Sequence, residues 1–108
     1  SPLAKQMIQH LAERFDAAAR RGDSVHQREQ ARFALLLQGD PKLALKLAQQ
    51  NWQVQKEPAD ARILLQAAVA SQQTAAARPV LQWLAQTRLE DQSIARLTRQ
   101  LGKKPGAA

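Results

Sequence analysis

The chain lacks cysteine and tyrosine, and its 108 residues include only two tryptophans and two phenylalanines. Without cysteine, disulfide frameworks and cysteine–zinc sites are excluded. The longest apolar runs cover a few residues, whereas a membrane-spanning helix needs about 20, so we expect no membrane span. The scarcity of aromatic residues also disfavours a surface on which nucleic-acid bases stack.

Patterns typical of an active site are also missing. The four glycines are not clustered into a phosphate-binding loop, and no serine lies in a G-x-S-x-G setting. The only histidines, His10 and His26, have no carboxylate or second histidine four residues later, and a metal site needs about three converging ligands. Close carboxylates such as Glu57 and Asp60 fall in the first turns of predicted helices, where they complement the helix dipole. We therefore expect no enzymatic activity, no metal and no cofactor.

Alanine, leucine and glutamine dominate the sequence, and these residues favour helices. Apolar residues recur at spacings of three and four, and no stretch alternates with the period of a strand. The sequence therefore predicts an all-α fold of about six helices. We expect them over 2–20, from 23 or 24 to 38, 40–54, 57–70, from 74 or later to 89, and 91–101.

Helix boundaries are marked by local signals. Ser24-x-x-Gln27 fits a capping box at the start of the second helix. Gly39 is expected to end that helix, and Asp40 followed by proline is expected to begin the third. Pro79 conflicts with a regular helix that starts at Thr74, so that helix either starts later, near residue 76, or is kinked.

A helix-pair unit occurs twice, over about 24–56 and 58–89. A period in the low thirties with helix–turn–helix content is typical of superhelical arrays. The stretch LLLQGDPKLALKLAQQNW, with Ala44, Ala48 and Asn51 in its second helix and Pro58 after it, resembles the tetratricopeptide repeat family. In the second unit, Ala77 and the leucines that follow it occupy the matching places.

The resemblance implies antiparallel helix pairs stacked as a right-handed superhelix, an α-solenoid. We expect one domain over 1–101, with flanking helices at 2–20 and 91–101, and a flexible basic tail at 102–108. The first helix would be the end of a preceding repeat and the sixth a cap. The pattern also resembles the C-terminal part of bacterial repeat proteins to which no activity is attached. Because the chain starts with Ser1 rather than methionine, we expect it to be part of a longer protein, with any signal peptide before Ser1. The resemblance implies that this protein lies in the bacterial cytoplasm or periplasm.

The function implied by this resemblance is protein–protein interaction or scaffolding. The first helices of such pairs line a concave surface on which a partner segment can lie. The residues expected to bind a protein or peptide partner are His26, Glu29, Arg32, Phe33, Leu36, Arg62 and Gln66.

The net charge of +7 keeps an alternative open. A helical domain with this excess of lysine and arginine could bind nucleic acid through phosphate contacts. The two functions differ in charge placement, since phosphate binding needs the basic residues on one face. Weak self-association is a third expectation, because the apolar stripe of the first helix has no predicted cover.

Overall fold

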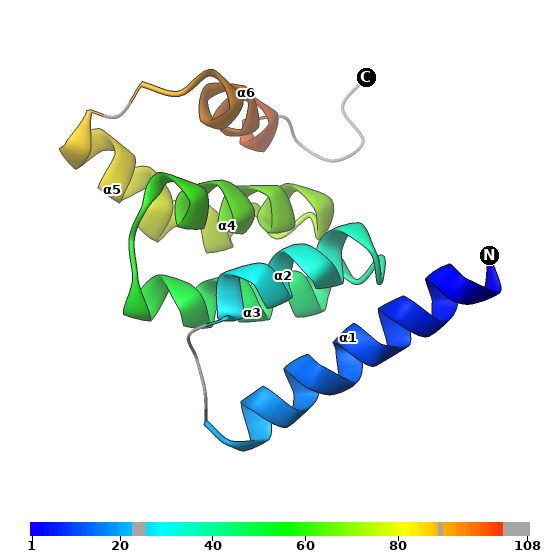
Figure 1. Cartoon of the computed structure of the whole chain (residues 1–108). Helices are drawn as coiled ribbons and strands as arrows, with labels where there is room; N and C mark the ends of the chain where they lie inside the picture. Colours follow the sequence, from blue (N-terminus) through cyan, green and yellow to red (C-terminus); the bar gives the residue numbers. More distant parts are fainter. Residues whose placement is uncertain (23–25, 89, 103–108) are drawn as a thin grey trace.

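The structure, a computed structural model, describes residues 1–22, 26–88 and 90–102. These residues form six α-helices and one short 3₁₀ helix, η1, and contain no strand. The all-α prediction is therefore confirmed (Figure 1). The elements are α1 (Pro2–Arg20), α2 (Gln27–Leu36), α3 (Pro41–Val54), α4 (Pro58–Ala70), η1 (Thr74–Ala77), α5 (Arg78–Thr87) and α6 (Gln92–Leu101).

The turn between α2 and α3 forms as its sequence predicts. Gly39 has φ +63°, a left-handed conformation that costs glycine little. Asp40 is the N-cap of α3, and its side chain accepts a hydrogen bond from the Leu43 N–H at 3.1 Å. Pro41 is the first residue of α3, where its missing N–H leaves no intrahelical bond unmade.

Pro79 delays the start of the fifth α-helix. The chain forms the 3₁₀ helix η1 first, and the regular helix begins at Arg78. Pro79 is then the second residue of α5, in the first turn, where a proline is tolerated. Of the two predicted outcomes, the later start is the one observed.

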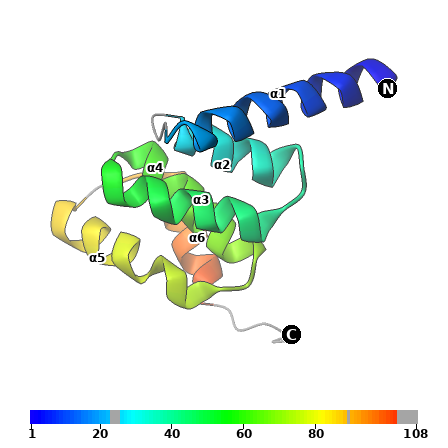
Figure 2. The same ribbon diagram turned by 90° about the horizontal axis from the view of Figure 1, so that it is seen from below.

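The four central helices, α2 to α5, run antiparallel to their neighbours in the chain. Figures 1 and 2 show them from two directions. α3 packs against both α2 and α4. The flanking helices depart from this order. α6 packs on α4 and runs across the central helices, so that it is seen nearly end-on in Figure 1. α1 is inclined to α2, and its N-terminal half projects beyond the stack.

The core lies among α2, α3, α4, η1, α5 and α6. α4 contributes most to it, with Ile63, Leu64 and Leu65 each no more than 1% exposed. Trp52 of α3 and Trp83 of α5 meet edge to face, with ring centroids 5.3 Å apart. This aromatic contact joins the second helices of the two predicted units.

Several predictions fall on residues outside the described ranges. Helix α2 begins at Gln27 with His26 as N-cap. Its predicted start at 23 or 24, together with Ser24 of the predicted capping box, lies outside the described residues. The predicted basic tail also lies outside them, apart from Gly102. Within the described ranges, no helix has the length and apolar character needed to cross a membrane.

Candidate interaction surface

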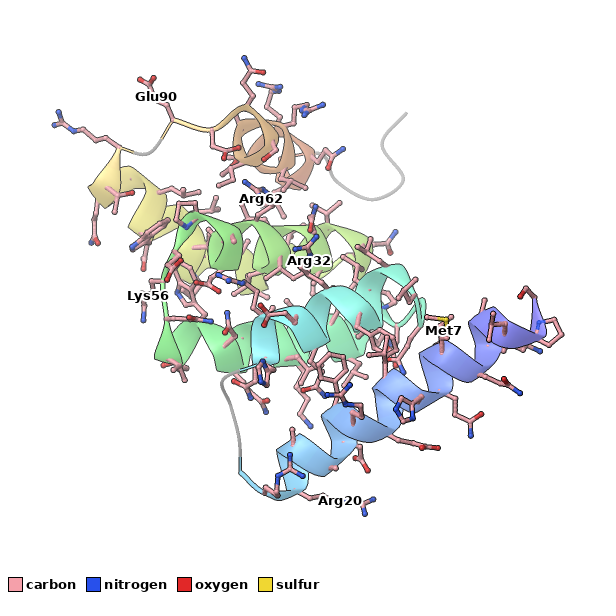
Figure 3. The ribbon with its side chains drawn as sticks, viewed as in Figure 1. Met7, Arg20, Arg32, Lys56, Arg62 and Glu90 are labelled. Atoms are coloured by element: carbon pink, nitrogen blue, oxygen red, sulfur yellow. The ribbon has the colours of Figure 1, made fainter. Side chains whose placement is uncertain are left out.

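Large apolar side chains are exposed on α1 and at the end of α2. Leu3 and Met7 on α1, and Leu36 and Leu37 at the end of α2, are 54 to 66% exposed. Met7 lies on the side of α1 that faces the loop between α2 and α3 (Figure 3). Exposed apolar groups of this size, gathered on two neighbouring elements, are typical of a surface that another molecule covers.

Phe33 does not face an open groove, contrary to the prediction. It is only 7% exposed, and its ring lies 5.5 Å from that of Phe15 on α1. The physical reason is that α1 crosses this face of α2 and buries the phenylalanine. Leu36, one turn further along α2, extends past this contact and is exposed.

The crossing of α1 over α2 encloses a pocket of about 340 Å³, which we call the α1–α2 pocket. Apolar residues and three basic side chains meet in it, together with one carboxylate. The lining residues are Leu11, Arg14, Phe15, Ala18, Arg21, His26 and Glu29. His26 and Glu29, two of the residues predicted to bind a partner, are thus brought together, but with α1 as their neighbour.

A second, shallower space of about 360 Å³ lies further along α2, and we call it the α2 hollow. Its lining residues are Glu29, Arg32, Phe33, Leu36 and Leu37. Because Glu29 borders both spaces, the pocket and the hollow are neighbours along α2. The five predicted residues on α2 therefore form one surface.

The two predicted residues on α4 do not join that surface. Arg62 points toward α6 (Figure 3), where its Nη2 lies 3.1 Å from Asp91 Oδ2 and its Nε donates to Ser93 Oγ at 3.0 Å. Gln66 is half-buried on the same helix. The groove expected along both first helices is thus interrupted, because α6 lies against α4 and binds its arginine.

Asp91 is the most strongly perturbed acid in the described part of the chain. Its pKa is lowered from an ordinary value of 3.8 to about 2. The largest cause is the hydrogen bond from the Ser93 hydroxyl, followed by the Ile94 N–H at the start of α6 and the charge and hydrogen bond of Arg62. Burial acts in the opposite direction. This carboxylate caps α6 and fastens it to α4, which is a structural role.

Asp60, at the start of α4, is fully buried. Its Oδ1 accepts hydrogen bonds from Asn51 Nδ2 at 2.7 Å and Arg28 Nη1 at 3.3 Å, and its Oδ2 accepts from the Glu57 N–H at 2.9 Å. Gln55 donates in turn to Asn51 Oδ1 at 2.8 Å. One carboxylate therefore connects three helices, as the sequence analysis did not foresee. The only signal was Asn51 on the helix face expected to pack inward, whereas Asp60 was expected only to complement the helix dipole.

A larger hollow, with a volume of about 990 Å³, lies elsewhere, between α5 and α6. Leu81, Leu84 and Ile94 form its apolar wall, and Asp91 and Arg99 lie at its edge. Ile94 is only 4% exposed and belongs to the core. We place the candidate surface on α1 and α2 because large apolar side chains are exposed there, whereas this hollow is lined by side chains that the fold already uses.

The chain matches no known protein family, and no curated protein or solved structure is similar to it. Within the described residues, no three histidine, aspartate or glutamate side chains lie close enough to hold one metal ion. The interpretation of the site therefore depends on its own geometry.

Proposed function

We propose that the chain is a non-catalytic protein-interaction module within a tetratricopeptide-repeat-like helical domain. Its binding surface would be the α1–α2 face, by which we mean the α1–α2 pocket, the α2 hollow, and the side chains of Leu3 and Met7. The observation that carries this proposal is the exposure of four large apolar side chains on that face, bordered by charged residues. Protein interfaces commonly combine an apolar centre with a polar rim.

Nucleic acid remains the alternative partner, but part of the basic charge already serves the fold. Arg28 lies 3.3 Å from Asp60, Arg62 lies 3.1 Å from Asp91, and Arg20 lies 2.9 Å from Asp16. Each pairing reduces the charge that could displace counterions from phosphates. This consideration favours a protein partner.

The proposal is tested by affinity capture from a lysate of the parent cell, at low and high salt, with and without nuclease. Three baits are compared: the wild type, Leu36→Gln/Leu37→Gln, and Val54→Gln. Val54 is a matched control because it is 65% exposed at the end of α3 and lines neither the α1–α2 pocket nor the α2 hollow. None of these side chains is buried, so all three baits are expected to fold.

We expect a discrete protein to survive nuclease and high salt on the wild type and on Val54→Gln. The double variant should retain about tenfold less, because loss of two central apolar contacts costs at least about 1.4 kcal/mol. Equal retention on all three baits would place the binding surface elsewhere. Loss of the bound material under nuclease would favour the nucleic-acid alternative.

A further inference from the structure

The two ends of the α1–α2 face differ in composition. The α2 hollow contains the exposed leucines with one basic residue, Arg32, whereas the α1–α2 pocket gathers three basic residues, Arg14, Arg21 and His26. The chemistry of the partner can therefore be inferred from the pocket. This inference rests on the proposed function, since it concerns the same surface.

The placement of the basic groups in the pocket follows from helix geometry. Arg14 lies on α1 and Arg21 is the C-cap residue of that helix, seven residues later, so the two lie on the same side about two turns apart. α1 ends at Arg20, and Gly22 follows with φ +73°. His26 begins α2 on the opposite wall of the pocket. Two guanidinium groups and an imidazole thus approach one space from two helices.

Among the residues that the structure describes, Glu29 is the only acid that lines the pocket, and it has a cationic neighbour. Glu29 Oε1 lies 3.8 Å from Arg28 Nη2. Arg28 does not line the pocket, and its guanidinium is shared with Glu57 and Asp60, so it balances only part of the charge of Glu29. The two arginines inside the pocket therefore leave it cationic. Leu11, Phe15 and Ala18 supply the apolar part of the lining, beside the exposed side chains of Arg14 and Arg21.

We propose that the α1–α2 face binds an acidic segment of a partner protein, with one carboxylate in the pocket between Arg14 and Arg21 and an apolar side chain in the α2 hollow. A guanidinium group binds a carboxylate through two parallel hydrogen bonds, and His26 offers a further donor. The exposed leucines supply the apolar contact.

The spacing of these two anchors is set by α2. His26 and Leu36 are ten residues apart at the two ends of the helix, which corresponds to about 15 Å. An extended segment spans this distance with about five residues, and a helical segment with about ten. The bound segment should therefore carry its acidic and apolar residues at one of these two separations.

A random-peptide display library, selected on the whole chain, tests this inference. Selected peptides are then measured on the wild type, on the leucine variant Leu36→Gln/Leu37→Gln, and on two charge-matched variants, Arg14→Gln/Arg21→Gln and the control Arg96→Gln/Arg99→Gln on α6. All four arginines are exposed, so both variants remove the same charge from the surface. The variant Arg14→Lys/Arg21→Lys keeps the charge, and circular dichroism checks the helix content of each protein.

We expect peptides with an acidic and an apolar residue about five or ten positions apart. They should bind about tenfold more weakly to Arg14→Gln/Arg21→Gln, because a charged hydrogen-bonded pair contributes at least about 1.4 kcal/mol. The control should change affinity by less than about threefold, as expected for screened surface charge. The lysine variant should retain most of the binding.

Two other results would overturn the inference in distinguishable ways. Selected peptides that bind through Leu36 and Leu37 but contain no preferred acidic position would refute the acidic partner and leave the proposed surface in place. Peptides whose binding changes neither with the leucine variant nor with the arginine variant, or a selection that enriches nothing, would contradict both proposals.

Discussion

At the scale of single residues, two aspartates at helix starts have different environments. Asp60 is buried and connects α2, α3 and α4, whereas Asp91 is partly exposed and fastens α6 to α4. Both carboxylates accept backbone hydrogen bonds at the starts of their helices. Their consequences for stability are therefore expected to differ in size and in pH dependence.

Replacing Asp60 with alanine should destabilise the fold strongly. The Asn51 amide, the Glu57 N–H and the Arg28 guanidinium would each lose an acceptor in a buried setting. We expect the free energy of unfolding to fall by about 3 kcal/mol, as when one partner of a buried ion pair is removed. Urea denaturation followed by circular dichroism measures this change.

Asp16→Ala is the matched control, since Asp16 forms an exposed ion pair with Arg20. We expect it to change the free energy of unfolding by less than about 0.5 kcal/mol. Equal effects of the two substitutions would show that the buried hydrogen bonds of Asp60 contribute nothing specific.

The lowered pKa of Asp91 predicts a loss of stability in acid. Its pKa of about 2 in the folded chain lies below the ordinary value of 3.8, so the ionised form favours folding. This contribution is complete above about pH 4 and is lost as the pH falls toward 2. The Asp91 carboxyl signal in an NMR titration should therefore move at about pH 2.

Ser93→Ala tests the cause of this shift, because the Ser93 hydroxyl makes the largest contribution. In that variant the pKa of Asp91 should rise toward 3.8. An unchanged titration would assign the shift to the helix N–H groups and to Arg62 instead.

Residue roles could be predicted where the partners are close in sequence. The N-cap Asp40 was foreseen, because its carboxylate accepts a hydrogen bond from an N–H group three residues ahead. Arg28 and Asp60 are 32 residues apart, and Arg62 and Asp91 are 29 apart. No local pattern reports such pairs, since they exist only after α4 has packed on its neighbours.

At the scale of elements, the α2–α3 turn depends on one glycine. Gly39 has φ +63°, and a Cβ added there would meet nothing within 4 Å. Gly39→Ala should therefore cost about 1 kcal/mol of unfolding free energy from backbone strain alone. Gly102, which has φ −73° after α6, provides the control. Gly102→Ala should leave stability nearly unchanged or slightly raised, and an equal loss in both variants would refute the strain argument.

Helix α1 is the least buried element. Ala18 is its only fully buried residue, and Phe15 provides its main described contact with α2. Amide hydrogen exchange should therefore be at least about tenfold faster in residues 2–10 than in α3 and α4. At high protein concentration, residues 2–10 could instead be protected from exchange as strongly as α3 and α4. If that protection were lost on dilution, it would indicate that a second copy of the chain covers the apolar stripe of α1.

At the scale of the whole molecule, the order and nature of the helices could be predicted, but not how the flanking helices pack. Periodicity and capping residues specify where helices begin and end. They do not specify that α1 would bury Phe33, or that α6 would cross α4 and bind Arg62. Five of the seven predicted binding residues share one surface because all five belong to α2, whereas the two on α4 were placed by family geometry that α6 interrupts.

The most direct test of the central proposal, that the α1–α2 face binds a protein partner, is to map where the captured protein contacts the domain. The captured protein would be titrated into the isotope-labelled chain and backbone amide shifts recorded by NMR. We expect the largest changes along α2 and α1, with Val54 and the hollow between α5 and α6 unaffected. Changes confined to the walls of that hollow, at Leu81, Leu84 and Ile94, would contradict the proposal.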